Sequence, residues 1–237
     1  MSEAIRLVTV GTRSRLAEAA VLADSLERLH PGAPRFLYLA ERGIADTDHA
    51  CGWSVRPATA LPLPDAERFL FQYPPLQLCC ALKPFALADV LREPGAPGAV
   101  YLDGDMLALA PFLDRIETAW READVLLTPH LCRPSPPEAA YPMLRMGVYN
   151  GGIMAVRNSR NGDAFLRWLQ GCLARDCVRN FTAGLFDDQK WLDLAAAVCD
   201  GVRPLRDPGL NAGHWNLHER AFQERPEGLW LEDAGPL

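Results

Sequence analysis

Short apolar segments alternate with helix-like segments in the first half of this chain, and this order is the strongest constraint on its fold. Ile5–Val10 is an apolar run that stops at Gly11, and Ser14–Leu29 repeats apolar residues at the three- and four-residue spacing of a helix. Phe36–Leu39 and the weaker Trp53–Val55 continue the pattern as strands. Alternating strands and helices predict a sheet covered by helices, which is an α/β fold.

The rest of the chain repeats the scheme less regularly. Further helices are expected at Leu76–Leu91, Phe112–Ala123, Ala164–Leu173 and Asp188–Val198, and further strands at Ala99–Leu102, Val125–Thr128, Val148–Val156 and Leu229–Leu231. Pro84 is expected to start a turn or force a kink, and the four prolines of Arg133–Pro142 predict a loop. Since no repeat or linker divides residues 1–237, we expect a single domain with a central mixed, mostly parallel sheet flanked by helices.

Composition narrows the functional class. Of the 237 residues, 49% are hydrophobic and 23% are charged, which is typical of a folded globular domain rather than a disordered chain. The net charge of −6 argues against nucleic acid as a general partner, although a local basic pocket could still bind a phosphorylated small molecule. No secretion leader or membrane span is recognisable, which favours a cytoplasmic protein. No pattern in the sequence indicates an oligomeric state.

The seven cysteines do not form a recognisable framework. Their number is odd and none of the paired CxxC spacings of a zinc site occurs. We therefore expect reduced, mostly buried thiols.

An acidic motif, Asp103-Gly104-Asp105, directly follows the apolar segment Ala99–Leu102. In open α/β sheets ligands bind at the carboxyl ends of the strands, which is where this motif falls. Residues i and i+2 of an extended backbone point the same way, and Gly104 lets the chain bend. One Mn²⁺ or Mg²⁺ ion could therefore touch both acids together with phosphate oxygens of a substrate. The alternative interpretation is an acidic turn that ends the strand.

Three further features carry polar groups at places where ligands could bind. Asn150-Gly151-Gly152 interrupts an apolar strand, which is typical of a bulge, a close approach of ligand to backbone, or a tight turn, and Asn150 can pair with a sugar hydroxyl. Asp187-Asp188-Gln189 opens a helix, and one of its acids is expected to be the N-cap. Lys83 either extends to solvent or points its ammonium at a phosphate or carboxylate.

The segment Asn211–Arg220 is the most polar and aromatic stretch of the chain. His214 and His218 are four residues apart, a spacing that could bind a metal on a helix. Gly213 and Asn216 instead favour an irregular loop, so a zinc site built on the two histidines alone is not expected.

Several of these motifs, in this order, resemble those of a known family. They are Ala81–Phe85, Val100–Asp105, Tyr149–Val156, Phe186–Gln189 and Asn216–Arg220. The chain is similar over nearly its whole length, Val8 to Leu237, to nucleotide-sugar glycosyltransferases of the GT-A type. Bacterial relatives of the glycogenin and lipopolysaccharide galactosyltransferase family are the most similar. The resemblance implies a single Rossmann-like GT-A domain, with a nucleotide-binding part at about residues 1–110 and an acceptor-side part at about residues 111–237.

The resemblance also implies a role for each matching residue. The donor site would consist of Thr9, Val10, Gly11, Lys83, Asp103, Gly104, Asp105, Asn150, Gly151, Gly152 and Asn216. The catalytic segment would be Asp188 and Gln189, and the Mn²⁺ or Mg²⁺ ligands would be Asp103, Asp105 and His218. The family takes its third metal ligand, a histidine, from a segment near the C-terminus, about where this sequence ends at Leu237. Either the chain is a piece of a longer protein, or His214, His218 or water replaces that ligand.

The implied reaction moves a sugar from a nucleoside-diphosphate donor, a UDP-sugar above all, to a carbohydrate or glycoconjugate acceptor in bacterial polysaccharide or glycoconjugate synthesis. The family resembled here transfers with retention, and Gln189 or a substrate-assisted path would assist the reaction. Two alternatives remain at this stage. One is a catalytically weak nucleotide-sugar binding module of a larger protein. The other is a haloacid-dehalogenase-like phosphatase, which also places two aspartates after an apolar strand but usually near its N-terminus.

Overall fold

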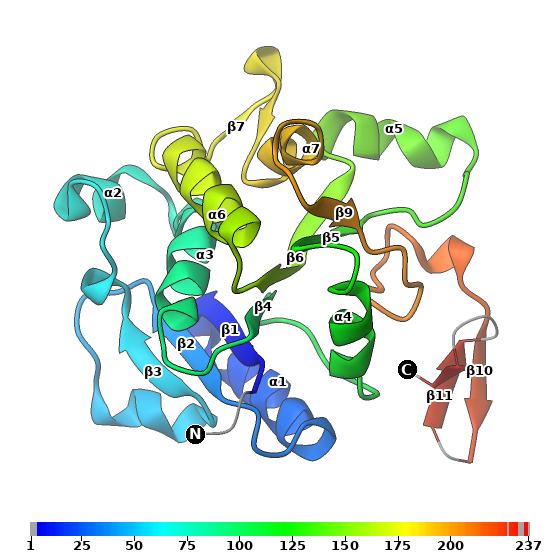
Figure 1. Ribbon diagram of the computed structural model, residues 1–237, viewed down its shortest axis with the longest axis horizontal. Helices are drawn as coiled ribbons and strands as arrows, with labels where there is room; N and C mark the ends of the chain where they lie inside the picture. Colours follow the sequence, from blue (N-terminus) through cyan, green and yellow to red (C-terminus); the bar gives the residue numbers. More distant parts are fainter. Residues whose placement is uncertain (1–3, 227, 232–234, 237) are drawn as a thin grey trace.

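A seven-stranded sheet forms the centre of the computed structural model, which describes residues 4–226, 228–231 and 235–236 (Figure 1). Its strands, in the spatial order β3-β2-β1-β4-β6-β5-β9, are β1 Arg6–Gly11, β2 Arg35–Leu39, β3 Ser54–Pro57, β4 Gly98–Leu102, β5 Val125–Pro129, β6 Tyr149–Arg157 and β9 Val202–Pro204. Strand β6 runs antiparallel to its neighbours β4 and β5, while the other neighbouring pairs are parallel. The predicted mixed, mostly parallel sheet is therefore confirmed.

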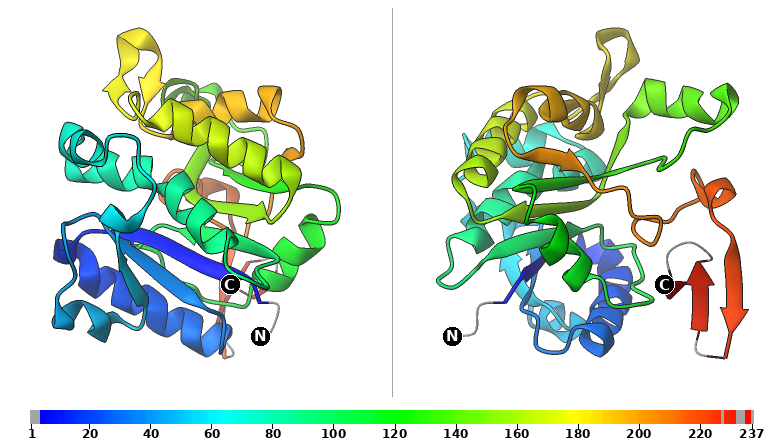
Figure 2. Two further views of the ribbon diagram at one scale, coloured as in Figure 1. Left: turned by 60° about the vertical axis from the view of Figure 1, so that its left-hand side comes forward. Right: turned by 45° about the vertical axis from the view of Figure 1, so that its right-hand side comes forward.

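Helices cover both faces of this sheet (Figure 2). The helices on one face are α3 Pro75–Leu91, α6 Arg160–Leu173 and α7 Gln189–Val198, and those on the other are α1 Leu16–Leu29 and α4 Leu113–Ala119. Each face has its own hydrophobic core, and alternate residues of β1 feed both: Val8 packs on the α3 side and Leu7 on the α1 side. A strand that is buried on both faces is mostly apolar, which explains why these short runs carried a clear signal.

Smaller elements surround the central layers. They are α2 Ala66–Gln72, α5 Pro137–Met146, the hairpin β7 Arg179–Asn180 with β8 Leu185–Phe186, and the antiparallel sheet β10 Phe222–Arg225, β11 Gly228–Leu231 and β12 Gly235–Pro236. The expected strand Leu229–Leu231 is thus present as part of β11, but it belongs to this separate small sheet, which stands beside the main body (Figure 1).

Among the expectations based on proline, the turn at Pro84 and a loop over the whole of Arg133–Pro142 are wrong, and the alternative of a kink at Pro84 stays a prediction. Helix α3 continues through Pro84, so no turn begins there, and the Pro84 carbonyl accepts a hydrogen bond from Gln170 Nε2 at 3.1 Å on α6. The expected loop Arg133–Pro142 contains the start of α5, because Pro137 occupies the first helical turn, where a missing backbone N–H costs nothing. Pro142 lies inside the same helix.

Across the described residues, no helix has both the length and the apolar character needed to cross a bilayer. All seven cysteines are free thiols.

Candidate active site

The two aspartates of the acidic motif leave the sheet at the carboxyl end of β4. This strand is buried along its whole length, so its apolar residues anchor the motif firmly. Asp103 N donates to Gly152 O at 2.9 Å, and the Tyr101 hydroxyl donates to Asp103 Oδ1 at 2.9 Å. The side chains of Asp103 and Asp105 are 38% and 58% exposed, and both line two cavities that meet at the motif. The acidic-turn interpretation does not account for these cavities.

One of these cavities, of about 290 Å³, brings together the donor-site candidates of the first half of the chain. They are Thr9, Val10, Gly11, Lys83, Asp103, Gly104 and Asp105, from β1, α3 and the end of β4. Thr9 is fully buried, and its Oγ1 has no hydrogen-bond partner in the structure. A buried hydroxyl without a partner is uncommon in native proteins. The Thr9 hydroxyl is therefore an unused hydrogen-bonding group in the wall of this cavity.

Lys83 is the buried centre of the charge arrangement. Its Nζ donates to Gly151 O at 2.9 Å and lies 3.0 Å from Asp188 Oδ2 and 3.3 Å from Asp103 Oδ1. Burial by itself would lower the pKa of the ammonium, but the carboxylates of Asp103 and Asp188 outweigh it and hold that pKa well above its ordinary value. The ammonium has three protons and three protein acceptors around it. Lys83 thus faces carboxylates rather than solvent.

The glycines of Asn150-Gly151-Gly152 make room for this arrangement. The segment lies within β6, and the pairing of β6 with β5 shifts register between Leu127 and Thr128, which confirms the expected irregularity and not a turn. A side chain on Gly151 would collide with Asp188 Oδ2 and lie 3.1 Å from Lys83 Nζ. The glycines therefore admit other side chains of this protein.

Asp188 occupies the N-cap position of α7, but its side chain makes no capping hydrogen bond. It is 2% exposed and is directed to Lys83 instead. Asp187 adopts a left-handed conformation with φ of 46°, which Asp tolerates better than most residues, and it accepts hydrogen bonds from Gln77 and Arg179 at 2.8 Å each. Gln189 Nε2 donates to Met146 O at 3.3 Å. Asp188 and Gln189 line neither cavity, so neither faces the proposed substrate space in this structure.

The second cavity, of about 600 Å³, lies on the other side of the acidic motif. Asn150 and Trp215 line it with Asp103 and Asp105, and most of its remaining lining is apolar. Both ends of the Asn150 amide are already engaged: Oδ1 accepts from Gly152 N at 2.7 Å, and Nδ2 donates to His130 Nε2 at 3.2 Å. Burial lowers the pKa of His130, which keeps the ring neutral and able to accept this hydrogen bond.

The polar stretch Asn211–Arg220 is an irregular segment held by its own side chains, as expected. Asn216 is fully buried: Nδ2 donates to His130 O at 2.8 Å and Oδ1 accepts from Gly213 N at 2.9 Å. Asn216 lines neither cavity and its amide shapes the loop, so its assignment as a donor-contacting residue stays a prediction without support from this geometry.

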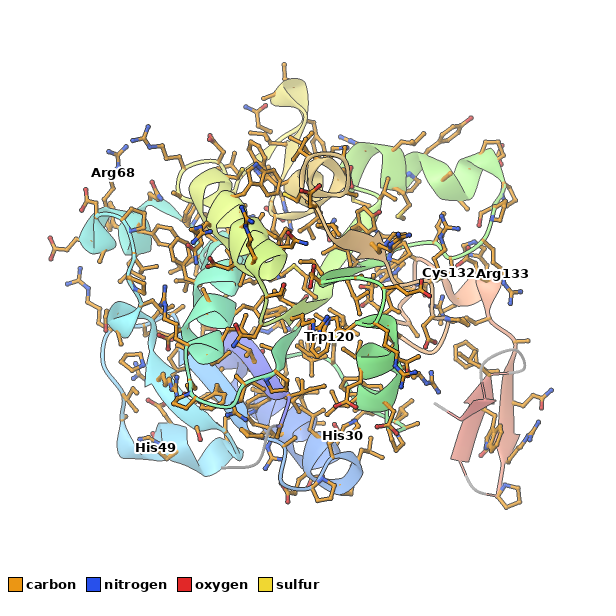
Figure 3. The ribbon with its side chains drawn as sticks, in the orientation of Figure 1. His30, His49, Arg68, Trp120, Cys132 and Arg133 are labelled. Carbon is orange, nitrogen blue, oxygen red and sulfur yellow. The ribbon has the colours of Figure 1, made fainter. Side chains whose placement is uncertain are left out.

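His218 is placed away from the two cavities. It is exposed, and its Nε2 lies 3.4 Å from Ser135 Oγ. The neighbouring Glu219 accepts hydrogen bonds from the backbone of Cys132 at 2.9 Å and Arg133 at 3.1 Å, and so fastens this turn to the loop after β5. Cys132 and Arg133 are labelled in Figure 3. The role of His218 as a metal ligand stays a prediction without support from this geometry.

The donor set at the acidic motif fits a divalent cation of the hard class. Two carboxylates facing one space suit Mg²⁺ or Mn²⁺, which commonly complete their shells with phosphate oxygens and water. Among the residues that the structure describes, no group of three His, Cys, Asp or Glu side chains is arranged to hold a metal. Asp103 and Asp105 would therefore hold the ion together with the phosphates of a substrate.

Two residues of this site were not assigned from the sequence. Tyr101 is buried beside Lys83, whose Nζ lies 4.9 Å from the ring centroid, and its hydroxyl holds Asp103. The two-residue period of a strand places Tyr101 and Asp103 on one face, which could have indicated this contact. Arg15 Nη2 lies 3.2 Å from Asp105 Oδ2, although the two residues are 90 positions apart in the sequence, and no local pattern predicts such a contact.

Comparison with known proteins supports the fold. No family model matches the chain. The chain is 26% identical over 238 residues to the uncharacterized protein YfnF of Bacillus subtilis (strain 168). The alignment covers 97% of this chain and 78% of YfnF.

Three solved glycosyltransferases share the architecture. The galactosyltransferase LgtC, in complex with donor and acceptor sugar analogs, is 15% identical with a TM-score of 0.51, covering 84% of this chain and 73% of that one. GlyE of Streptococcus pneumoniae TIGR4 is 14% identical with a TM-score of 0.53, covering 85% of this chain and 45% of that one. The bifunctional glycosyltransferase WbbM is 12% identical with a TM-score of 0.50, covering 85% of this chain and 38% of that one. The chain therefore has the GT-A fold that the motifs predicted.

Proposed function

We propose that this chain transfers a sugar from a nucleoside-diphosphate donor, a UDP-sugar in the first instance, to a carbohydrate or glycoconjugate acceptor. The observation that carries the proposal is the convergence of seven donor-site candidates on one cavity, at the carboxyl ends of β1 and β4. The GT-A fold supports it, because LgtC has this fold and is a galactosyltransferase in complex with donor and acceptor sugar analogs. The relative YfnF is a bacterial protein, which supports a bacterial setting for the proposed reaction.

The chemistry required of the protein is the stabilisation of negative charge. When the bond between the sugar carbon and the diphosphate breaks, negative charge gathers on the diphosphate. A Mn²⁺ or Mg²⁺ ion held by Asp103 and Asp105 would supply Lewis-acid stabilisation of that charge. Tyr101 and Lys83 hold Asp103 in place through contacts of 2.9 and 3.3 Å, so the carboxylate is oriented before any ligand arrives. The unpartnered Thr9 hydroxyl would bind the nucleoside part of the donor.

Asp188 and Gln189 have a supporting part in this proposal. Asp188 fixes Lys83 from one side, and Gln189 anchors the backbone at Met146 beside the start of β6. The resemblance implies transfer with retention, so the proposed reaction keeps the configuration at the sugar carbon that is transferred.

The test is the incubation of the protein with UDP-glucose, UDP-galactose and GDP-mannose, each with Mn²⁺ and with a chelator, while release of the nucleoside diphosphate is measured. We expect release from at least one UDP-sugar with Mn²⁺, its loss in chelator and in Asp105→Asn, and its retention in the exposed control Asp24→Asn. Binding of the nucleotide sugars without release would instead favour a binding module. Release of inorganic phosphate from phosphate monoesters would instead favour the phosphatase.

A further inference from the structure

The two aspartates of the acidic motif are neutralised by different kinds of cation. Asp103 Oδ1 lies 3.3 Å from Lys83 Nζ, and Asp105 Oδ2 lies 3.2 Å from Arg15 Nη2. The Lys83 side chain is 4% exposed, whereas that of Arg15 is 52% exposed. One counter-ion is therefore built into the core, and the other stands at the mouth of the cavity.

Only Arg15 of these two is free to move. Lys83 is held by Gly151 O and by the buried Asp188 in addition to Asp103. The other partner of Arg15 is Glu18, which accepts from Arg15 Nε at 2.6 Å and is itself 46% exposed. An exposed ion pair favours the paired over the separated state of its side chains by about fivefold at most, so a stronger partner can separate Arg15 from Asp105.

Arg15 also lies where a diphosphate would arrive. Arg15 lines the 290 Å³ cavity together with Lys83, Asp103 and Asp105. One further acid, Glu18, also lines this cavity. The ion pair with Arg15 occupies a carboxylate oxygen of Asp105 that a divalent cation would need. A guanidinium that has lost its carboxylate presents a planar fork of N–H donors, which matches two phosphate oxygens.

We propose that Arg15 is a movable counter-ion of the donor site. In the free protein it neutralises Asp105. When a divalent cation binds Asp105, Arg15 leaves the carboxylate and pairs with phosphate oxygens of the nucleoside diphosphate. This inference rests on the proposed function, because it requires a metal ion and a nucleoside diphosphate at the same cavity.

The proposal predicts effects of opposite sign on two ligands. In Arg15→Gln, Mn²⁺ alone should bind about threefold more tightly, because no cation competes for Asp105. UDP in the presence of Mn²⁺ should bind about tenfold more weakly, because a charge-assisted pair to the phosphates is lost. Both affinities are measured by calorimetry.

The matched control is Arg28→Gln. Arg28 lies in α1, which begins directly after Arg15, forms an exposed pair with Asp24 at 2.6 Å and lies outside the cavity, so both affinities should equal those of the unmodified protein. Arg15→Lys keeps the charge but not the fork, and it should recover only part of the UDP affinity. Circular dichroism confirms that each variant is folded.

The outcomes separate this inference from the function on which it rests. If the unmodified protein binds both ligands and Arg15→Gln changes neither affinity, or weakens both together, the movable counter-ion is refuted and the proposed function stands. If the unmodified protein binds neither Mn²⁺ nor UDP, the proposed function and the inference are refuted together.

Discussion

Lys83 Nζ and Asp188 Oδ2 lie 3.0 Å apart, in an ion pair whose two side chains are only 4% and 3% exposed. The pair joins the middle of α3 to the first turn of α7, two elements separated by about a hundred positions of sequence. Asp188 gives up its capping role to make this contact. The pair therefore holds Lys83 in place, and Lys83 in turn contacts Asp103 of the candidate site.

Removal of the lysine charge should destabilise the fold. In Lys83→Met the carboxylate of Asp188 remains buried without a counter-ion, and we expect a loss of about 3–5 kcal/mol in the free energy of unfolding, measured in urea. The double variant Lys83→Met/Asp188→Asn removes both charges and should recover part of that loss. The chain has one other lysine, Lys190, whose pair with Asp193 at 2.8 Å is less buried, so Lys190→Met should cost about 1 kcal/mol or less. Losses that simply add in the double variant would contradict this account of the pair.

Gly151 should not tolerate even one methyl group. In Gly151→Ala the new Cβ collides with Asp188 Oδ2, which separates the ion pair, and we expect a loss of about 1–3 kcal/mol in thermal or urea unfolding. Gly171 in α6 has no heavy atom within 4 Å of a built Cβ, so Gly171→Ala should be neutral or stabilising by up to about 1 kcal/mol. Equal effects of the two substitutions would show that space around Gly151 is not limiting.

His130 should make stability depend on pH. Burial lowers the pKa of its ring in the folded protein, so below about pH 6.5 the unfolded chain binds a proton that the folded chain does not. The free energy of unfolding should therefore decrease as the pH falls from 7 to 5, with up to about 1.4 kcal/mol per pH unit due to this ring. His130→Gln should make the profile shallower, whereas the exposed His49→Gln should leave it unchanged. An identical profile in His130→Gln would rule out this source of pH dependence.

Much of the fold follows from local patterns. The central strands are buried on both faces, so most of their residues are apolar, and the acidic motif at the end of β4 falls at the sheet edge where ligands bind. Proline was less informative. Its effect depends on where a helix begins: Pro137 occupies the first turn of α5, where proline is tolerated, so a cluster of prolines does not exclude a helix.

The site was harder to predict in its details than in its position. The cavity at β1 and β4 collects seven of the eleven expected donor-site residues, because chain order and strand ends determine their position, whereas Gly151, Gly152 and Asn216 line neither cavity. The contacts of Lys83, Asp188 and Arg15 join segments that are far apart in the sequence, and such long-range contacts cannot be predicted from local patterns in a single sequence. Asn216 has the chemistry of a ligand-binding amide, yet the fold uses that amide inside its own loop.

The central claim is that Asp103 and Asp105 bind a nucleoside diphosphate through a divalent cation, and calorimetric titration with UDP tests it most directly. The titration is done in Mn²⁺ and in a chelator, for the unmodified protein and for Asp105→Asn. Because the shell of the ion is completed by phosphate oxygens, we predict tight binding of UDP only with Mn²⁺, and its loss in the variant. Equal affinity in Mn²⁺ and in chelator, or an Asp105→Asn variant that binds UDP as the unmodified protein does, would contradict the claim.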